Sequence, residues 1–232
     1  MCYFTMFMAL AAGPAHSSDL LESGSPETFS QASVTEVKIS PSGDFLAIRV
    51  LQFGKYKLHF LDRETLANLG ELAFSQNREV GEFHWANDER VVAEVHELSA
   101  NGEESHYSGE LVAANYNGGL VSQIQLGSHL QGASPIKVVD PLPDNSKNIL
   151  ISSMPMASAN GIRGMAVLLN VYNDVEERQF TLMPETHTQF YSDGNGEIQI
   201  IEHQNTAGIK NSKISKGNLT NHLGASLTKT GF

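Results

Sequence analysis

Histidines and carboxylates gather in one part of this sequence, where together they could bind a metal ion. The histidines are His84, His96 and His106, and the nearby acids are Glu94, Glu97, Glu103 and Glu104. Imidazole and carboxylate are ordinary zinc ligands, but the nine histidines of the chain form no His-x-His, His-x3-His or His-Glu-x-x-His motif. A chance cluster on strand and loop surfaces is therefore favoured over a metal site. The sequence predicts no metal ligand, no cofactor-binding residue and no catalytic residue.

Four other features are interpreted as structural. Trp85 is the only tryptophan and is expected to wedge between neighbouring sheets, with ligand stacking as the alternative. Asp88, Glu89 and Arg90 are expected in a turn that holds a local ion pair worth under about 1 kcal/mol. Residues 193–197 resemble a calcium loop but lack the EF-hand spacing, which favours a plain turn. Asn218 begins a glycosylation sequon, which matters only in a eukaryotic source.

The elements that carry these residues follow a pattern that returns roughly every 45–55 residues. Each copy is a short apolar strand, a polar turn and a second apolar strand, which is typical of a β-hairpin. The copies cover residues 37–50, 83–95, 136–151 and 190–201. The chain is therefore expected to build stacked antiparallel sheets.

Further hairpins lie between these copies. Polar and apolar residues alternate in segment 55–61, which enters a turn at 62–65. Two further pairs of expected strands each flank a turn: 110–115 with 120–126, and 165–171 with 178–182. Each unit thus has four strands, and the one helical candidate, 65–74, is broken by Gly70. The predicted fold class is all-β, a partial β-propeller of about four antiparallel four-stranded blades, without a closed seven-bladed ring.

The expected domain organisation has four parts. Residues 1–17 are expected to be a signal peptide, 18–34 a flexible lead-in, 35–203 the β-propeller blades, and 204–232 a polar stretch that is a truncated last blade or a tail. The signal peptide is inferred from the apolar run 3–12, with cleavage after Ala15 or Ser17. The positively charged residues that usually begin a signal peptide are missing, and a buried N-terminal strand or helix is the alternative. Export places the protein in the periplasm or outside the cell.

Composition excludes several classes of function. The net charge is −11, from 26 acids against 15 bases, and no basic run is present, so a nucleic-acid partner is not expected. Outside the N-terminal segment no run approaches the ~20 apolar residues of a membrane span. Cys2 is the single cysteine, which excludes an intrachain disulfide.

Three segments together resemble the N-terminal propeller of the prolyl oligopeptidase family of serine peptidases. Residues 39–47 (ISPSGDFLA) match its S-P-[DS]-G-x-x-[LI]-A hairpin, and 83–92 (FHWANDERVV) match its W-x-N-D-x-R-[LV] hairpin. Residues 110–119 (ELVAANYNGG) match the L-[YV]-x-[VA]-[ND]-x-[DN]-G-G segment that often closes a blade, and 191–197 resemble a later D-x-x-G hairpin. The resemblance covers about residues 37–201, although TolB-like and other propellers use similar hairpins.

The resemblance implies a non-catalytic role. In this family the propeller caps the active site of a following α/β-hydrolase domain and filters peptide or protein substrates by size. That domain carries its serine on a Gly-x-Ser-x-Gly elbow, which this chain lacks. The nearest sequences, 132–136 and 224–228, both lack the final glycine. No catalytic residue of the family is carried over, and the chain is expected to be inactive alone because it is truncated before the catalytic domain.

Two alternatives remain open at this point. The chain could be a stand-alone periplasmic TolB-like propeller module that binds a protein or glycan, or, less favoured, an independent enzyme. In either propeller interpretation the outer faces of the first and last blades lack a neighbour. Self-association through the terminal blades is therefore expected, and salt should strengthen it by screening charge repulsion.

Overall fold

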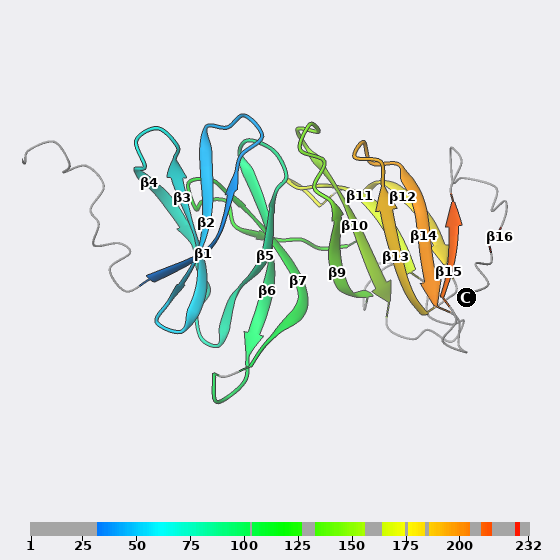
Figure 1. Cartoon of the computed structure of the whole chain (residues 1–232), viewed down its shortest axis with the longest axis horizontal. Helices are drawn as coiled ribbons and strands as arrows, with labels where there is room; N and C mark the ends of the chain where they lie inside the picture. Colours follow the sequence, from blue (N-terminus) through cyan, green and yellow to red (C-terminus); the bar gives the residue numbers. More distant parts are fainter. Residues whose placement is uncertain are drawn as a thin grey trace, which may run out of the picture.

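In the computed structural model of the chain, every regular element of the described residues is a β-strand (Figure 1). The structure describes residues 32–102, 104–126, 133–155, 164–174, 176–183, 186–204, 210–214 and 226–227. In these residues the strands form four antiparallel sheets of four strands each, side by side along the longest axis of the molecule. The described residues contain no helix, and hence no helix that could cross a membrane.

Each sheet is built from four strands that follow one another in the sequence. The first sheet contains β1 (Ala32–Ile39), β2 (Phe45–Gln52), β3 (Lys55–Asp62) and β4 (Asn68–Leu72). The second contains β5 (Arg78–Trp85), β6 (Arg90–Leu98), β7 (Ser105–Asn115) and β8 (Ser122–Gln123). The third contains β9 (Ala133–Asp140), β10 (Asn148–Pro155), β11 (Gly164–Asn170) and β12 (Glu176–Met183). The fourth contains β13 (Thr186–Ser192), β14 (Ile198–Gln204), β15 (Lys210–Ile214) and β16 (Ser226–Leu227).

This arrangement confirms the predicted all-β fold of about four antiparallel four-stranded blades. Strand structure extends past the expected limits of the blades at both ends. β1 begins at Ala32, within the expected lead-in 18–34, and β15 and β16 complete the fourth sheet beyond position 203. β15 has the sequence KNSKI. Because most of its residues are polar, it lacks the alternation of apolar and polar residues by which strands are predicted. The expected signal peptide, residues 1–17, lies outside the described residues.

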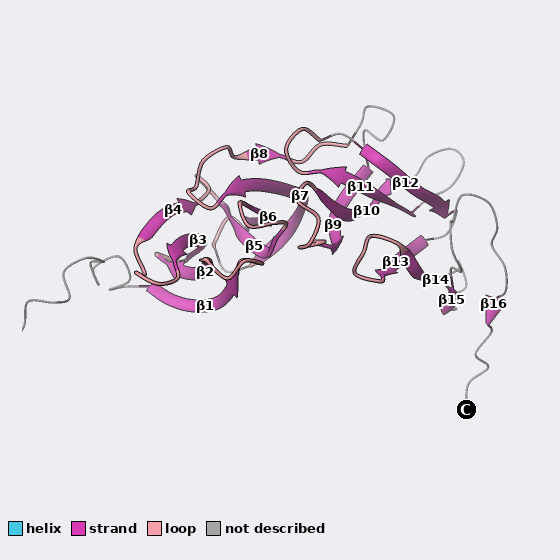
Figure 2. Ribbon diagram, turned by 90° about the horizontal axis from the view of Figure 1, so that it is seen from above, coloured by secondary structure: helices cyan, strands magenta, loops and turns pink. Residues whose placement is uncertain are grey.

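The strands of each sheet are ordered from one side of the molecule to the other. Figure 2 shows that β1, β5 and β9 lie on one side of the molecule and that β4, β8 and β12 lie on the opposite side. β1 contacts β5, and β9 contacts β13. We call the first strand of each sheet its inner strand. Inner strands meet between the first and second sheets and between the third and fourth sheets, whereas β9 packs against β7 of the second sheet.

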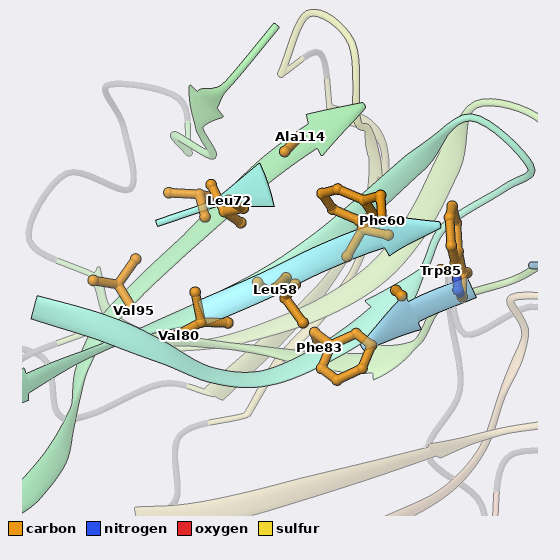
Figure 3. Close-up of a cluster of buried hydrophobic side chains, with 12 residues drawn as sticks. Leu58, Phe60, Leu72, Val80, Phe83, Trp85, Val95 and Ala114 are labelled. Atoms are coloured by element: carbon orange, nitrogen blue, oxygen red, sulfur yellow. The ribbon is translucent and has the colours of Figure 1, made fainter. Parts of the chain in front are cut away.

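Apolar side chains pack between the faces of neighbouring sheets. Between the first and second sheets, Phe60 and Leu58 lie against Phe83, Val80 and Trp85 (Figure 3). Similar clusters join the second sheet to the third and the third to the fourth; their members include Leu111 with Ile149, and Leu150 with Phe190. Alternating apolar residues on each strand create these clusters, because every second side chain of a strand points to the same face.

Two glycines allow the backbones of the first and second sheets to touch. A Cβ atom at Gly70 would lie 2.2 Å from the Asn117 carbonyl oxygen. Gly118 has a φ of +73°, and a Cβ there would lie 2.5 Å from the Glu71 carbonyl oxygen. Any larger residue would force the two sheets apart, since real Cβ atoms do not approach other heavy atoms this closely. The Asn-Gly turn predicted from sequence thus sets the spacing between sheets as well as closing a hairpin.

The tip of the β2–β3 hairpin gives a first stability prediction. Phe53 is 78% exposed and has a φ of 51°, and Gly54 follows it with a φ of 74°. Two positive φ angles define a turn that favours Asn-Gly, whereas a bulky residue is strained at the first position. Phe53→Asn is expected to raise the free energy of unfolding by about 0.5–1 kcal/mol in urea titration. Phe53→Val, which is β-branched, should lower it; a loss of stability in the asparagine variant would contradict this account.

Candidate functional site

The inner hairpin turns, which connect the first two strands of each sheet, form the candidate functional surface. They cover residues 40–44, 86–89, 141–147 and 193–197. The first and second turns meet where the backbone N–H of Ser42 donates to the carboxylate of Asp88. The second and third meet where Asn87 Nδ2 donates to the Ser146 carbonyl oxygen at 2.8 Å. These contacts bring residues from distant parts of the sequence to one end of the sheets, where scaffold turns commonly carry binding residues.

Asn87 satisfies all of its side-chain amide groups at the junction of the second and third sheets. Its Oδ1 accepts the backbone N–H groups of Glu89 and Arg90 at 2.8 and 2.9 Å, which shapes the turn between β5 and β6. Its Nδ2 donates to the Tyr172 hydroxyl at 3.1 Å as well as to the Ser146 carbonyl. Since the residue is only 6% exposed, each of these bonds compensates for lost hydration. Asn87 thus couples the shape of one turn to the position of the next sheet.

Arg90 is the main correction to the sequence interpretation. Its guanidinium forms no ion pair with Asp88 or Glu89 in the described part of the chain, and it is 2% exposed. Its nitrogen atoms donate to Val171 O at 2.8 Å, Asn115 Oδ1 at 2.7 Å, Leu120 O at 3.0 Å and Ser122 Oγ at 2.7 Å. Burial lowers the pKa of this guanidinium from its usual value.

The same guanidinium joins the second sheet to the third. The bonds to Asn115, Leu120 and Ser122 hold β7, β8 and the turn between them, all in the second sheet. The bond to Val171 reaches the turn after β11, and the Tyr172 ring of that turn lies 5.3 Å from the guanidinium carbon. A planar group with five donors suits such a junction, whereas a lysine could not replace it. We call Arg90 and Asn87, with their partners on both sheets, the inter-sheet clamp.

The third and fourth sheets are joined by a smaller set of contacts. Ser192, at the end of β13, donates its hydroxyl to the Asp140 carboxylate at the end of β9. Asp140 also accepts the backbone N–H of Leu142 at 3.0 Å. Gly196 has a φ of +89°, and a Cβ there would lie 3.3 Å from Leu142. Carboxylate, hydroxyl and glycine therefore serve packing between sheets at this junction.

Exposed carboxylates surround the inner hairpin turns. They are Asp44, Asp88, Glu89, Asp144 and Asp193. Hydrogen bonds from backbone N–H groups, first that of Asn195, lower the pKa of Asp193, so this carboxylate is charged at neutral pH. Residues 193–197 form the plain turn expected from sequence, with Asp193 Oδ1 also accepting the backbone N–H of Glu197 at 3.2 Å. The local field favours cationic over anionic groups near these turns.

The three clustered histidines do not converge. Each lies near a different glutamate: His84 is 3.2 Å from Glu82, His96 is 3.0 Å from Glu94, and His106 is 3.9 Å from Glu97. Within the described ranges no group of three or more His, Cys, Asp or Glu residues could hold a metal ion. Burial is the main cause that lowers the pKa of His84, which favours its neutral form. Glu103, Cys2 and the sequon at Asn218 lie outside the described residues.

One serine, one histidine and one acid do lie close together, a contact that sequence reasoning missed. Ser105 Oγ is 3.4 Å from His96 Nδ1, and His96 Nε2 is 3.0 Å from Glu94 Oε2. Hydrolysis would require the serine proton to pass to the histidine. The Ser105 hydroxyl instead donates to Glu79, which is 2% exposed and also accepts the backbone N–H of Tyr56 at 3.0 Å. This geometry fits a structural link between β3, β5, β6 and β7.

Trp85 lies where the sequence interpretation expected it, between the first and second sheets. Its side chain is 5% exposed and forms an edge-on contact with Phe60, with ring centroids 6.1 Å apart. Its Nε1 donates to the Lys38 carbonyl oxygen of β1 at 3.1 Å. Because both the ring and its polar atom are engaged, the wedge interpretation is confirmed and ligand stacking is not supported.

Comparison with known proteins finds only distant similarity to solved structures. No protein-family model and no curated protein sequence matches this chain. A candidate dipeptidyl aminopeptidase IV from Bacteroides ovatus is similar at 12% identity and a TM-score of 0.46, over 79% of this chain and 26% of that one. A candidate 6-phosphogluconolactonase from Bacteroides fragilis is similar at 14% identity and a TM-score of 0.36, over 84% of this chain and 54% of that one.

An oligogalacturonate lyase from Vibrio parahaemolyticus is similar at 12% identity and a TM-score of 0.31, over 77% of this chain and 64% of that one. The chain thus spans less than two thirds of the length of each of these three proteins. The consecutive four-stranded antiparallel sheets, with their faces packed on one another, define a propeller-like all-β protein.

Proposed function

We propose that this chain is the non-catalytic propeller of an exported serine peptidase of the prolyl oligopeptidase type, and that it controls access of peptides to a hydrolase domain. The observation that carries the proposal is the placement of the family-like motifs. Residues 39–47 and 83–92 each span the inner hairpin of a sheet, and residues 110–119 cover the end of β7 and the turn that leads to β8 in the second sheet. The motifs therefore occupy blade positions in the order that the resemblance requires.

The motif residues also have physical roles that suit a rigid gate. In the second motif, Trp85 packs against the first sheet, and Asn87 and Arg90 bind the third. A gate must hold its blades in fixed relative positions if it is to discriminate substrates by size. The sequence motif and the inter-sheet clamp thus support the same role, with peptides or small proteins as substrates and the periplasm or the cell exterior as the location.

The proposal is tested by reading the coding DNA in frame beyond the codon for Phe232. We expect a hydrolase domain whose serine lies in a Gly-x-Ser-x-Gly motif. A frame that closes without such a domain would contradict the proposal and favour a stand-alone module that binds a protein or glycan.

A second test addresses gating in the longer protein. Asn87→Ala removes bonds from both the turn and the third sheet, so the blades should move more freely. We expect kcat/KM for long peptides to rise relative to that for dipeptide substrates, and Leu66→Ala, at an exposed outer turn, to leave the ratio unchanged. An unchanged ratio in a folded Asn87→Ala protein would contradict control of access by the blades.

A further inference from the structure

Exposed apolar residues lie around the inter-sheet clamp, at the junction of the second and third sheets. Leu120 and Val121, between β7 and β8, are 73% and 51% exposed, and Tyr172, in the turn after β11, is 44% exposed. Arg90 holds both segments, since it donates to the Leu120 and Val171 carbonyl oxygens at 3.0 and 2.8 Å. Two separate segments thus present apolar residues around one buried guanidinium. We call Leu120, Val121 and Tyr172 the junction patch.

The Tyr172 ring is held in place without being buried. The guanidinium carbon of Arg90 lies 5.3 Å from the ring centroid. The Tyr172 hydroxyl accepts a hydrogen bond from Asn87 Nδ2 at 3.1 Å and lies 3.5 Å from Glu89 Oε2. A ring that is already fixed loses little conformational entropy when a partner binds, and tyrosine is enriched among the residues that dominate interfaces. Exposed ring surface beside a carboxylate suits a cationic side chain.

Leu120 has a backbone conformation that its own packing does not explain. Its φ is 47°, in the left-handed region that glycine and asparagine adopt more readily than leucine. Because the side chain is largely exposed, contacts within the described chain do not offset this strain. Strained residues are found preferentially at ligand-binding and other functional positions. A contact with a partner is therefore a better account of this leucine than a role in the fold.

The turns that adjoin the junction patch are acidic. Glu89 lies beside the turn after β7, since its carbonyl oxygen accepts the backbone N–H of Tyr116 at 2.9 Å. Asp174 lies close enough to the Arg90 guanidinium for their charges to interact. In the described turns 86–89, 116–121, 141–147 and 171–174 the acids are Asp88, Glu89, Asp144 and Asp174, and the base is Lys147. Since Arg90 is buried and already bonded to four acceptors, the surface field favours a cationic partner.

We propose that the junction patch binds a basic peptide segment of another protein, in which an arginine or lysine stands next to a large apolar residue. The cationic side chain stacks on the Tyr172 ring and approaches the Glu89 carboxylate, and the apolar side chain packs on Leu120 and Val121. The inter-sheet clamp holds these groups in place before the partner arrives, which lowers the entropic cost of binding. The inference concerns the second and third sheets and does not depend on the proposed peptidase function.

Titration of the isotope-labelled full chain with blocked tripeptides, followed by amide NMR shifts, tests the proposal. Arg-Leu-Arg at millimolar concentration should shift amides in residues 116–122 and 171–174, and added salt should weaken its binding. Arg-Gly-Arg, which lacks the apolar side chain, should bind about threefold or more weakly, and Glu-Leu-Glu should not bind at this surface. No shifts at the junction with Arg-Leu-Arg, or equal binding of Glu-Leu-Glu, would overturn the proposal.

Variants separate binding from folding at the junction patch. Leu120→Asn should weaken Arg-Leu-Arg binding about threefold or more without lowering the free energy of unfolding, because asparagine tolerates a positive φ. Leu66→Asn is the matched control: Leu66 is 59% exposed with a φ of 57° in the corresponding turn of the first sheet, and its replacement should leave binding unchanged. Glu89→Gln should weaken binding by a similar factor and reduce its dependence on salt. Full affinity in both Leu120→Asn and Glu89→Gln would overturn the assignment of this surface.

Discussion

Trp85→Ala is expected to lower the free energy of unfolding by about 3–5 kcal/mol. The ring fills space between the first and second sheets, where Phe60 and Phe83 also pack, and the substitution would leave a cavity there. It would also leave the Lys38 carbonyl oxygen without its indole donor. Urea unfolding followed by circular dichroism measures the change, since the variant lacks the only tryptophan.

Trp85→Phe separates packing from the hydrogen bond. It keeps an aromatic ring in the cluster and loses the Nε1 donor, so we expect a smaller loss than for alanine, about 1–3 kcal/mol. A loss under about 1 kcal/mol for Trp85→Ala would mean that the two sheets do not pack through this residue.

Arg90→Ala should destabilise the chain by a similar amount, about 3–5 kcal/mol. The substitution removes the four hydrogen bonds of the guanidinium and leaves the Val171 and Leu120 carbonyl oxygens without this donor. It also removes the contact with the Tyr172 ring. Loosening at the junction should appear as faster amide hydrogen exchange in β8 and in the turn after β11.

Two further variants make the Arg90 prediction specific. Arg90→Lys keeps the positive charge but cannot reach all four acceptors, so it should recover only part of the loss. Arg63→Ala, at an exposed turn of the first sheet, should change stability by less than about 0.5 kcal/mol. Equal effects of Arg90→Ala and Arg63→Ala would contradict the inter-sheet clamp.

Local sequence was enough to predict the hairpins. Ser40 to Asp44 and Tyr116 to Gly119 are turns because proline, glycine, asparagine and aspartate favour their backbone angles, and the flanking strands alternate apolar residues. The role of Trp85 could also be predicted, since a large ring at the end of a strand has few places other than a core.

Contacts between distant segments could not be predicted in the same way. Arg90 follows two acids, so local reasoning assigned it a turn ion pair, but its partners lie in β7, β8 and the turn after β11. Ser105 and His96 meet only because β6 pairs with β7. The alternation of apolar and polar residues within one strand does not show which strand it pairs with. The same criterion misses β15, a largely polar strand that pairs with β14.

Reaction of the full chain with a fluorophosphonate probe tests the central claim most directly, namely that this propeller carries no acyl-transfer site of its own. Such a site needs an activated nucleophile, a base and an oxyanion hole together, whereas the Ser105 hydroxyl donates to the Glu79 carboxylate. We predict no serine labelling above that of the Ser105→Ala variant, under conditions that label a known serine hydrolase to completion. Stoichiometric labelling of one serine, lost in the corresponding alanine variant, would contradict the account.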